Sequence, residues 1–86
     1  MPEISRFFGI VIKMYFDDHL PAHFHAEYGE YQAVLDVNRL AVISGRLPPR
    51  AVGLVMEWAS LHQSELMVQW ERAANLEPLG RIAPLE

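Results

Sequence analysis

A short stretch of the chain, residues 17–27, concentrates the side chains that bind metal ions or transfer protons near neutral pH. Three of the four histidines, His19, His23 and His25, fall within seven consecutive positions. Three carboxylates and one proline lie beside them: Asp17, Asp18, Glu27 and Pro21. Metal or acid–base chemistry in this protein is therefore predicted to centre on this stretch.

The spacing of two of these histidines is compatible with a metal site. His23 and His25 are two residues apart, so their rings point to the same face of an extended strand. Such a pair supplies two nitrogen ligands, and a third from His19 or Asp36 would complete a site for a divalent metal such as zinc, iron or manganese. In the alternative arrangement, Asp36 is not a ligand and instead orients the ring of His23.

A metal bound there would activate a water molecule for attack on an electrophile, with Glu27 or Asp18 as general base. The competing interpretation is that these residues are solvated side chains on the open side of a hairpin. Pro21 and the neighbouring aspartates would then only shape the loop.

The elements that must hold this stretch are predicted to be strands. Residues 6–16 are rich in β-branched and aromatic side chains and are expected to form one strand, which turns a wholly apolar side to the core. That side consists of Phe8, Ile10, Ile12, Met14 and Phe16. Residues 17–22 are expected to be a loop, and residues 40–44 a short fourth strand.

Residues 23–28 and 31–37 are expected to pair around a Gly29-Glu30 turn of type II′. This turn sets the register, in which Tyr28 faces Tyr31, Ala26 faces Ala33, Phe24 faces Leu35 and His23 faces Asp36. One side of the hairpin is then apolar and covered. The other side is polar and open, and it carries His23, His25, Glu27, Gln32 and Asp36.

One long helix is predicted from Pro48 to about Asn75, because proline is favourable in a first helical turn and Pro78 and Gly80 follow the end. Its apolar face should pack on the sheet. That face contains Val52, Val55, Met56, Ala59, Leu66, Trp70 and Ala73. His62 lies on the flank of this face, so we expect a hydrogen-bonded histidine at its rim and no part in the histidine cluster.

A second apolar stripe on the helix consists of Leu54, Trp58, Leu61 and Val68. Two interpretations remain open. The stripe forms a homodimer or partner-binding surface, since a patch of this size is rarely left in water. Alternatively, the tail, residues 77–86, folds back over it through Leu79, Ile82 and Leu85.

The composition limits the remaining possibilities. The chain has 86 residues, no cysteine and a formal net charge of −4. A single small domain, residues 1–76 with an extended tail at 77–86, is therefore expected, without disulfides or thiolate metal sites. The scattered basic residues argue against nucleic-acid binding. The acidic N-terminus and the short apolar run argue against a signal peptide or a membrane span, so a cytoplasmic protein is expected.

Several short motifs occur along nearly the whole chain. They are Pro2-Glu3-Ile4, Phe8-Gly9-Ile10, Met14-Tyr15, the DHLPAHFHA block at 18–26, Gly45-Arg46-Leu47-Pro48, Trp58, Glu65-Leu66 and Trp70. In these motifs the chain resembles the bacterial domain-of-unknown-function family 4160. Ala22 stands where the family usually has a second proline, which leaves the shape of this loop open.

The resemblance implies a small α+β domain and no established activity. It also implies a genetic setting, because family members often lie beside genes of uncharacterised family 2442 in pairs that look like toxin–antitoxin modules.

The sequence therefore predicts an α+β fold with about four antiparallel strands and one long C-terminal helix on the apolar face. The leading functional hypothesis is a small cytoplasmic protein-interaction module, acting as a homodimer or with a small protein partner. The alternative is a metal-dependent hydrolase or nuclease-like toxin that uses His19, His23 and His25.

Overall fold

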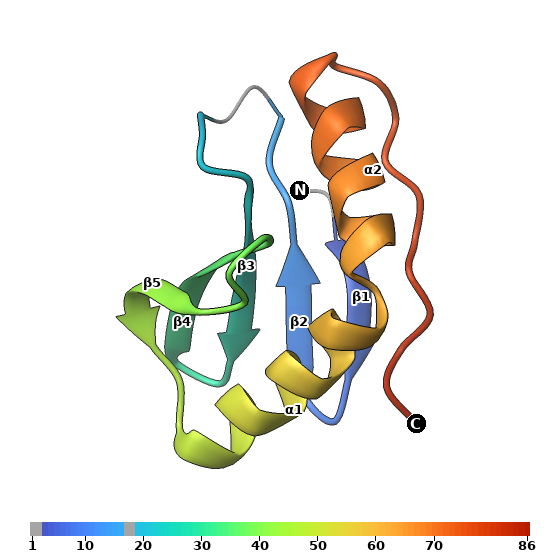
Figure 1. The fold of residues 1–86 in the computed structure, drawn as a ribbon. Helices are drawn as coiled ribbons and strands as arrows, with labels where there is room; N and C mark the ends of the chain where they lie inside the picture. Colours follow the sequence, from blue (N-terminus) through green and yellow to red (C-terminus); the bar gives the residue numbers. More distant parts are fainter. Residues whose placement is uncertain (1–2, 17–18) are drawn as a thin grey trace.

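The fold combines one sheet with one layer of helices. The computed structural model describes residues 3–16 and 19–86. Its sheet has five antiparallel strands in the order β1-β2-β3-β4-β5, and both helices cover the same face of the sheet (Figure 1). The strands are β1 (Glu3–Phe7), β2 (Ile10–Lys13), β3 (His23–Tyr28), β4 (Tyr31–Asp36) and β5 (Val42–Arg46). The predicted α+β class is confirmed, whereas the predicted number of strands is wrong.

The extra strand arises because residues 6–16 form a hairpin and not one strand. The chain reverses at Phe8 and Gly9, which have φ angles of 50° and 82°. Two successive residues with positive φ are typical of a tight hairpin turn. The turn leaves Phe8 60% exposed and buries Phe7 instead. Phe16 is also exposed, so only the middle of the predicted apolar side, Ile10, Ile12 and Met14, lies in the core.

The central hairpin agrees with the sequence-based register. In β3 and β4, His23 faces Asp36, Phe24 faces Leu35, Ala26 faces Ala33 and Tyr28 faces Tyr31. Gly29 has a φ of 58°, the positive value that the first position of a type II′ turn requires. The predicted apolar side is buried except for Tyr28 and Tyr31, which lie next to the turn.

The last strand lies two residues later than predicted, at Val42–Arg46, and all five of its residues are exposed. Gly45 has a φ of 71°, and a Cβ atom there would lie 2.2 Å from the carbonyl oxygen of Gln32. Only glycine allows this close approach between β4 and β5.

Two helices replace the single predicted helix: α1 (Pro49–Leu61) and α2 (Gln63–Ala74). The start at the prolines and the end at Asn75 agree with the prediction. The break is at His62, where φ is −126°, and its N–H donates to the carbonyl of Ala59. The side chain of Gln63 then donates to the carbonyls of Val37 (2.7 Å) and Asn38 (3.0 Å) and so fixes the start of α2 to the turn that follows β4.

The tail, residues 77–86, has no helix or strand and lies alongside α2 and β1 (Figure 1). Ile82 is only 3% exposed, and its N–H donates to the carbonyl of Ile4 in β1 (2.8 Å). The amide of Gly80 donates to the side chain of Gln69 in α2 (2.8 Å). The tail is therefore packed on the domain.

Neither α1 nor α2, within residues 3–16 and 19–86, has the length and apolar character that crossing a membrane requires.

Candidate functional site

The face of the sheet opposite the helices holds a small polar hollow. The register of β2 to β5 places Lys13, His25, Val34 and Ser44 in one row across the sheet, and residues paired in this way share a face. The hollow beside this row has a volume of about 170 Å³. It is lined by Tyr15, His25, Ala26, Glu27, Gln32, Ala33, Val34, Ser44 and Gly45.

The charges in this hollow are largely balanced. The carboxylate of Glu27 pairs with the ammonium group of Lys13 at 3.1 Å. The ring of Tyr15 meets the ring of His25 edge-on, with 4.6 Å between the centroids. The lining also includes the side chains of Gln32 and Ser44, which can hydrogen-bond a polar side chain or small molecule.

His23 lies at the end of the same face but belongs to the packed interior. It is 6% exposed, and its ring centroid lies 5.0 Å from that of Trp70 in α2. Its Nδ1 donates a hydrogen bond to the carbonyl of Pro21 (2.7 Å), since a carbonyl only accepts. The rings of His25 and His19 lie 5.4 and 6.1 Å away. The structure thus brings the three histidines together around a buried, packed imidazole.

Asp36 faces His23 as predicted, but its carboxylate shapes the loop after β4. The side chain is buried, and its Oδ1 accepts the backbone N–H groups of Asn38 (2.8 Å) and Arg39 (2.9 Å). This pattern is that of an Asx turn. The contacts give Asp36 a local role that needs no metal.

Within residues 3–16 and 19–86, no three His, Asp or Glu side chains are grouped so that they could hold a metal ion. The predicted site at His19, His23, His25 and Asp36 thus gains no support there. The proposed general base Asp18, and Asp17 next to it, lie outside the described residues.

His62 agrees with its predicted place at the rim of the helix face. Its Nδ1 lies 2.6 Å from a carboxylate oxygen of Glu65, and its ring packs near Trp58. It is on the helix layer, apart from the histidines of the sheet.

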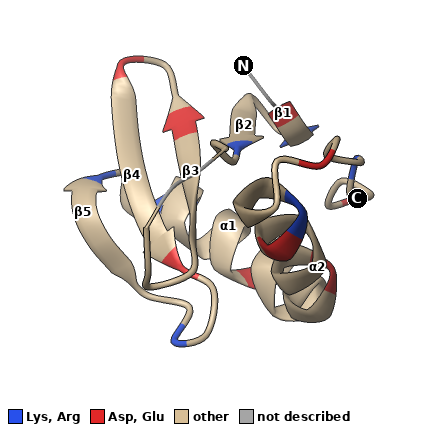
Figure 2. Cartoon of the chain, turned by 90° about the horizontal axis from the view of Figure 1, so that it is seen from above, with Lys and Arg blue, Asp and Glu red and all other residues tan. Residues whose placement is uncertain are grey.

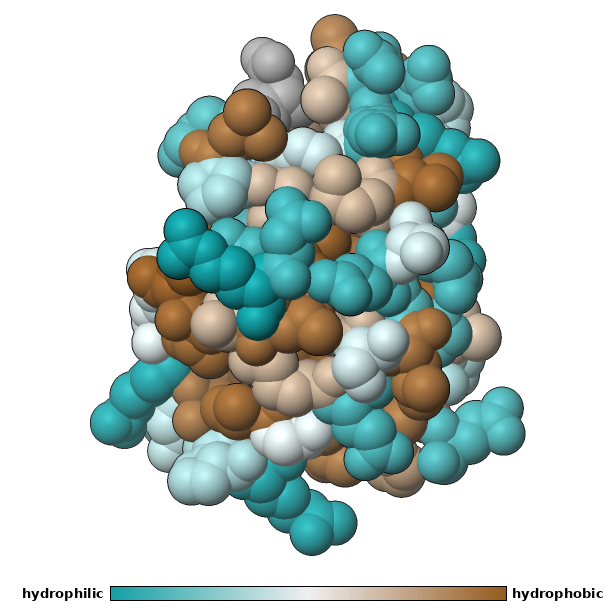
Figure 3. All heavy atoms as spheres, in the orientation of Figure 1, coloured by the Kyte–Doolittle hydropathy of each residue, from teal (hydrophilic) through white to brown (hydrophobic). Residues whose placement is uncertain are grey.

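The second helix stripe is not one continuous surface. Trp58 is fully buried against Phe7 and Phe24, and its Nε1 donates to the carbonyl of Ala83 in the tail (2.8 Å). Leu61 and Val68 are exposed. In Figure 3, which views the helix layer, brown apolar residues are separated by teal polar ones.

Leu54, the remaining member of the predicted stripe, is partly buried and lines a shallow groove at the start of α1. Phe8, Tyr28 and Arg50 line the same groove. The tail covers Trp58 but leaves Leu61 and Val68 exposed, so the interpretation in which the tail covers the stripe is correct only in part.

The two outer strands of the sheet differ in what covers them. At β1 the tail supplies the backbone bond from Ile82 to Ile4. Arg81 adds a bond to the carbonyl of Glu3 (3.3 Å) and an ion pair with its carboxylate (2.9 Å). No described segment lies beyond β5 in the sheet, and the helices leave its residues exposed.

The carboxylate of Glu3 joins the tail and β1 electrostatically. Hydrogen bonds from Arg6 (2.7 Å) and Arg81 (2.9 Å) lower the pKa of Glu3 from 4.5 to about 2. The same contact with Glu3 raises the pKa of Arg6. Glu3 is therefore ionised over the whole physiological pH range.

Sequence reasoning missed the role of β5. The strand has a register shift between Val34 and Leu35 of β4 and a glycine with positive φ. These irregularities place Ser44 and Gly45 at the hollow, which a search for regular alternation does not predict. Tyr15 and Gln32 were assigned to strands without a role at the site, although the cross-strand register places Gln32 beside Glu27.

This arrangement defines a small α+β domain with a polar hollow beside an uncovered strand. The family model described as Domain of unknown function (DUF4160) matches residues 9–71, which is more than half of the chain. The chain therefore belongs to this family, as the motifs of the sequence indicated. No curated protein and no solved structure matches the chain significantly. The matched region includes β5 and the histidine stretch, and it excludes β1 and the tail.

Proposed function

We propose that this protein is a small cytoplasmic protein-interaction module that binds an extended segment of another protein along β5. One observation supports the proposal above others: the tail covers the outer side of β1, whereas no described segment pairs with the outer side of β5.

An uncovered outer strand favours strand addition for a simple reason. Such a strand presents backbone N–H and C=O groups that lack partners within the sheet. An added strand pairs with these groups, and the side chains along the edge then provide specificity. In β5 the apolar side chains of Val42 and Ile43 are exposed as well. An added strand would remove apolar surface from water while it satisfies the backbone.

The hollow lies next to this edge, because Ser44 and Gly45 of β5 line it. A strand added to β5 extends the open face and brings every second side chain to the side of the hollow. Gln32, which is exposed and lines the hollow, then offers its side-chain amide to a polar side chain of the partner.

Leu61 and Val68 provide a second candidate contact surface, on the helix layer. Because Trp58 is buried, a homodimer or partner interface on the helices would have to use these two residues. Function within a toxin–antitoxin-like pair would give such a module a partner, and that idea rests on the family resemblance alone.

The metal-dependent hydrolase hypothesis has no observation in its favour among the described residues. It is tested by the metal content of the untagged protein, measured by mass spectrometry beside the His23→Ala/His25→Ala double variant. Near-stoichiometric zinc, iron or manganese that disappears in the variant would replace the interaction proposal.

The interaction proposal is tested by selecting a random peptide display library on the immobilised full chain. Selected peptides are then titrated into the isotope-labelled protein and followed by NMR. We expect the largest amide shift changes at residues 42–46, and we expect Ile43→Asp to weaken binding at least about tenfold, since a charge on an edge strand opposes pairing.

Leu76→Asp is the matched control, because Leu76 and Ile43 are both exposed apolar residues and Leu76 lies in neither candidate contact surface. This variant should bind like the wild type. The proposal fails if no selected peptide shifts the β5 amides, or if Leu76→Asp abolishes binding while Ile43→Asp does not.

A further inference from the structure

The charges around β5 separate it from the rest of the chain. Residues 37–56 contain three arginines, Arg39, Arg46 and Arg50, and no aspartate or glutamate. The remainder of the chain has four basic and eleven acidic residues, since the totals are seven and eleven. The segment that contains the uncovered strand is thus positively charged, although the chain as a whole is acidic.

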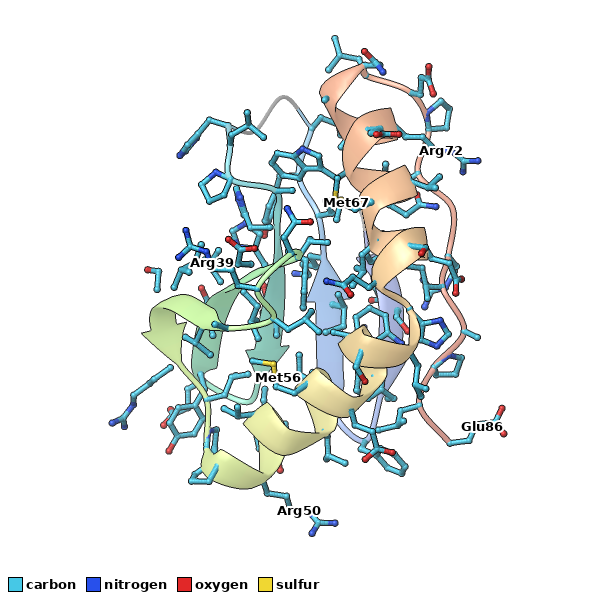
Figure 4. The ribbon with its side chains drawn as sticks, in the orientation of Figure 1. Arg39, Arg50, Met56, Met67, Arg72 and Glu86 are labelled. Carbon is cyan, nitrogen blue, oxygen red and sulfur yellow. The ribbon has the colours of Figure 1, made fainter. Side chains whose placement is uncertain are left out.

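These arginines are available to a partner. All three are exposed, and within the described part of the chain none of them forms an ion pair. Arg46 lies over the ring of Tyr31, with its guanidinium carbon 5.4 Å from the ring centroid. Figure 2 shows a basic residue, in blue, at one end of β5. Figure 4 labels Arg39, which precedes β5 in the chain, and Arg50, which follows it, and both side chains extend outward.

We infer that the segment that binds β5 is acidic: an extended strand of another protein with carboxylates at its ends and small or β-branched residues between them. The inference rests on the proposed function, according to which the partner binds as an added strand. The arginines indicate that this strand carries negative charge. Exposed guanidinium groups attract carboxylates over about a Debye length of 8–10 Å, which steers the partner to the edge before the backbone pairs.

A second copy of this chain is a poorer occupant of the same edge. Antiparallel pairing of β5 with β5 would bring the arginines of both copies into one interface. Residues 37–56 contribute no carboxylate to separate them. Such an interface gathers the positive charges of both copies without a compensating carboxylate, which opposes association. The charge pattern therefore favours a different, acidic chain.

The test compares three synthetic probes on the full chain by fluorescence anisotropy. One peptide alternates glutamate with valine and threonine, the second has glutamine at every glutamate position, and the third has lysine there. We expect the glutamate peptide to bind tightest and to weaken as salt is raised from about 0.05 to about 0.5 M. The glutamine peptide should bind more weakly without this salt dependence.

The arginines are tested one at a time. Arg46→Gln and Arg39→Gln should each weaken binding of the glutamate peptide by about two- to fivefold, the usual contribution of an exposed ion pair. Neither variant should change binding of the glutamine peptide. Arg72→Gln is the matched control, because Arg72 is an exposed arginine in α2, and it should leave the affinities for the probes unchanged.

Different results distinguish this inference from the proposed function. If all three probes shift the β5 amides with equal affinity, an interaction edge exists and the inference of an acidic partner is wrong. If no probe and no library peptide shifts these amides, the proposed function itself is wrong. If the protein sediments as a dimer that Ile43→Asp dissociates, a second copy occupies β5 and the inference is also wrong.

Discussion

The two outer strands of the sheet show how one small domain treats equivalent edges differently. At β1, Ile82 of the tail donates its N–H to Ile4 and buries its side chain, while Arg81 pairs with Glu3. At β5, every residue is exposed and no described segment adds a bond. Outer strands are aggregation hazards unless they are covered or interrupted.

The covered edge at β1 stabilises the domain, whereas the uncovered edge at β5 is available for binding. The tail adds apolar burial to a domain whose small size limits its core. The β5 edge has a register shift and a left-handed glycine, which reduce unspecific pairing without covering the strand. An edge that is irregular but uncovered is suited to selective binding. The basic residues near it in the chain favour a partner with negative charge.

The largest expected effect tests the closed edge. Ile82→Ala should lower the free energy of unfolding by about 2–5 kcal/mol, because it removes a buried aliphatic side chain between the tail and β1. The matched variant Ile43→Ala on β5 should change it by no more than about 0.5 kcal/mol, as is usual for exposed positions. Urea denaturation measures both. Equal effects would show that the two edges do not differ in this way.

The shape of the open edge depends on Gly45. Gly45→Ala should lower the free energy of unfolding by about 1–3 kcal/mol, because φ is positive and the new Cβ would meet the carbonyl oxygen of Gln32. Gly29→Ala has the same backbone strain but open space, so it should cost less. Gly53→Ala, in an open position of α1, should stabilise the protein by up to about 1 kcal/mol. Thermal unfolding orders the three variants.

The polar attachment of the tail should have a smaller effect. Gln69→Leu removes the acceptor of the partly buried Gly80 amide and should cost about 1 kcal/mol, the low end of the range for a donor that loses its partner. Hydrogen exchange at the Gly80 amide should become faster in this variant, while exchange in β3 and β4 stays slow. Unchanged exchange at Gly80 would contradict the role given to Gln69.

The smallest effect is expected at the ion pairs of Glu3. A carboxyl group whose pKa is lowered on folding stabilises the folded state above its unfolded pKa and loses this contribution as the pH falls through the folded pKa. The difference in melting temperature between wild type and Glu3→Gln should therefore be small near neutral pH and vanish between about 4.5 and about 2. Because the Glu3 carboxylate remains partly exposed, solvent screening keeps its contribution small, and a large difference would contradict this account.

The predictability of the site differs from residue to residue. The pairing of His23 with Asp36 followed from the Gly29-Glu30 turn, since a two-residue loop allows one register. The burial and contacts of the His23 and Asp36 side chains could not be predicted from this register. Whether His23 is solvated or packed depends on Trp70, which lies 47 positions later in the chain and reaches it through the direction of α2.

The strand and helix boundaries show the same division. Pro49 and Asn75 marked the ends of the helical region because their effects are local. The break at His62 could not be predicted from the local sequence, because neither glycine nor proline occurs there. The turn at Phe8-Gly9 lies within an apolar run, where a phenylalanine with positive φ is unexpected.

The sequence by itself determined the α+β class, the central hairpin with its register, the helical region, the buried helix residues Val55, Ala59, Leu66, Trp70 and Ala73, and the family. These depend on periodicity and turn chemistry within a few residues of each position. The tertiary structure alone decided that the tail covers β1 and Trp58 and that the outer side of β5 stays open. Those features depend on contacts between residues far apart in the chain, which local patterns do not determine.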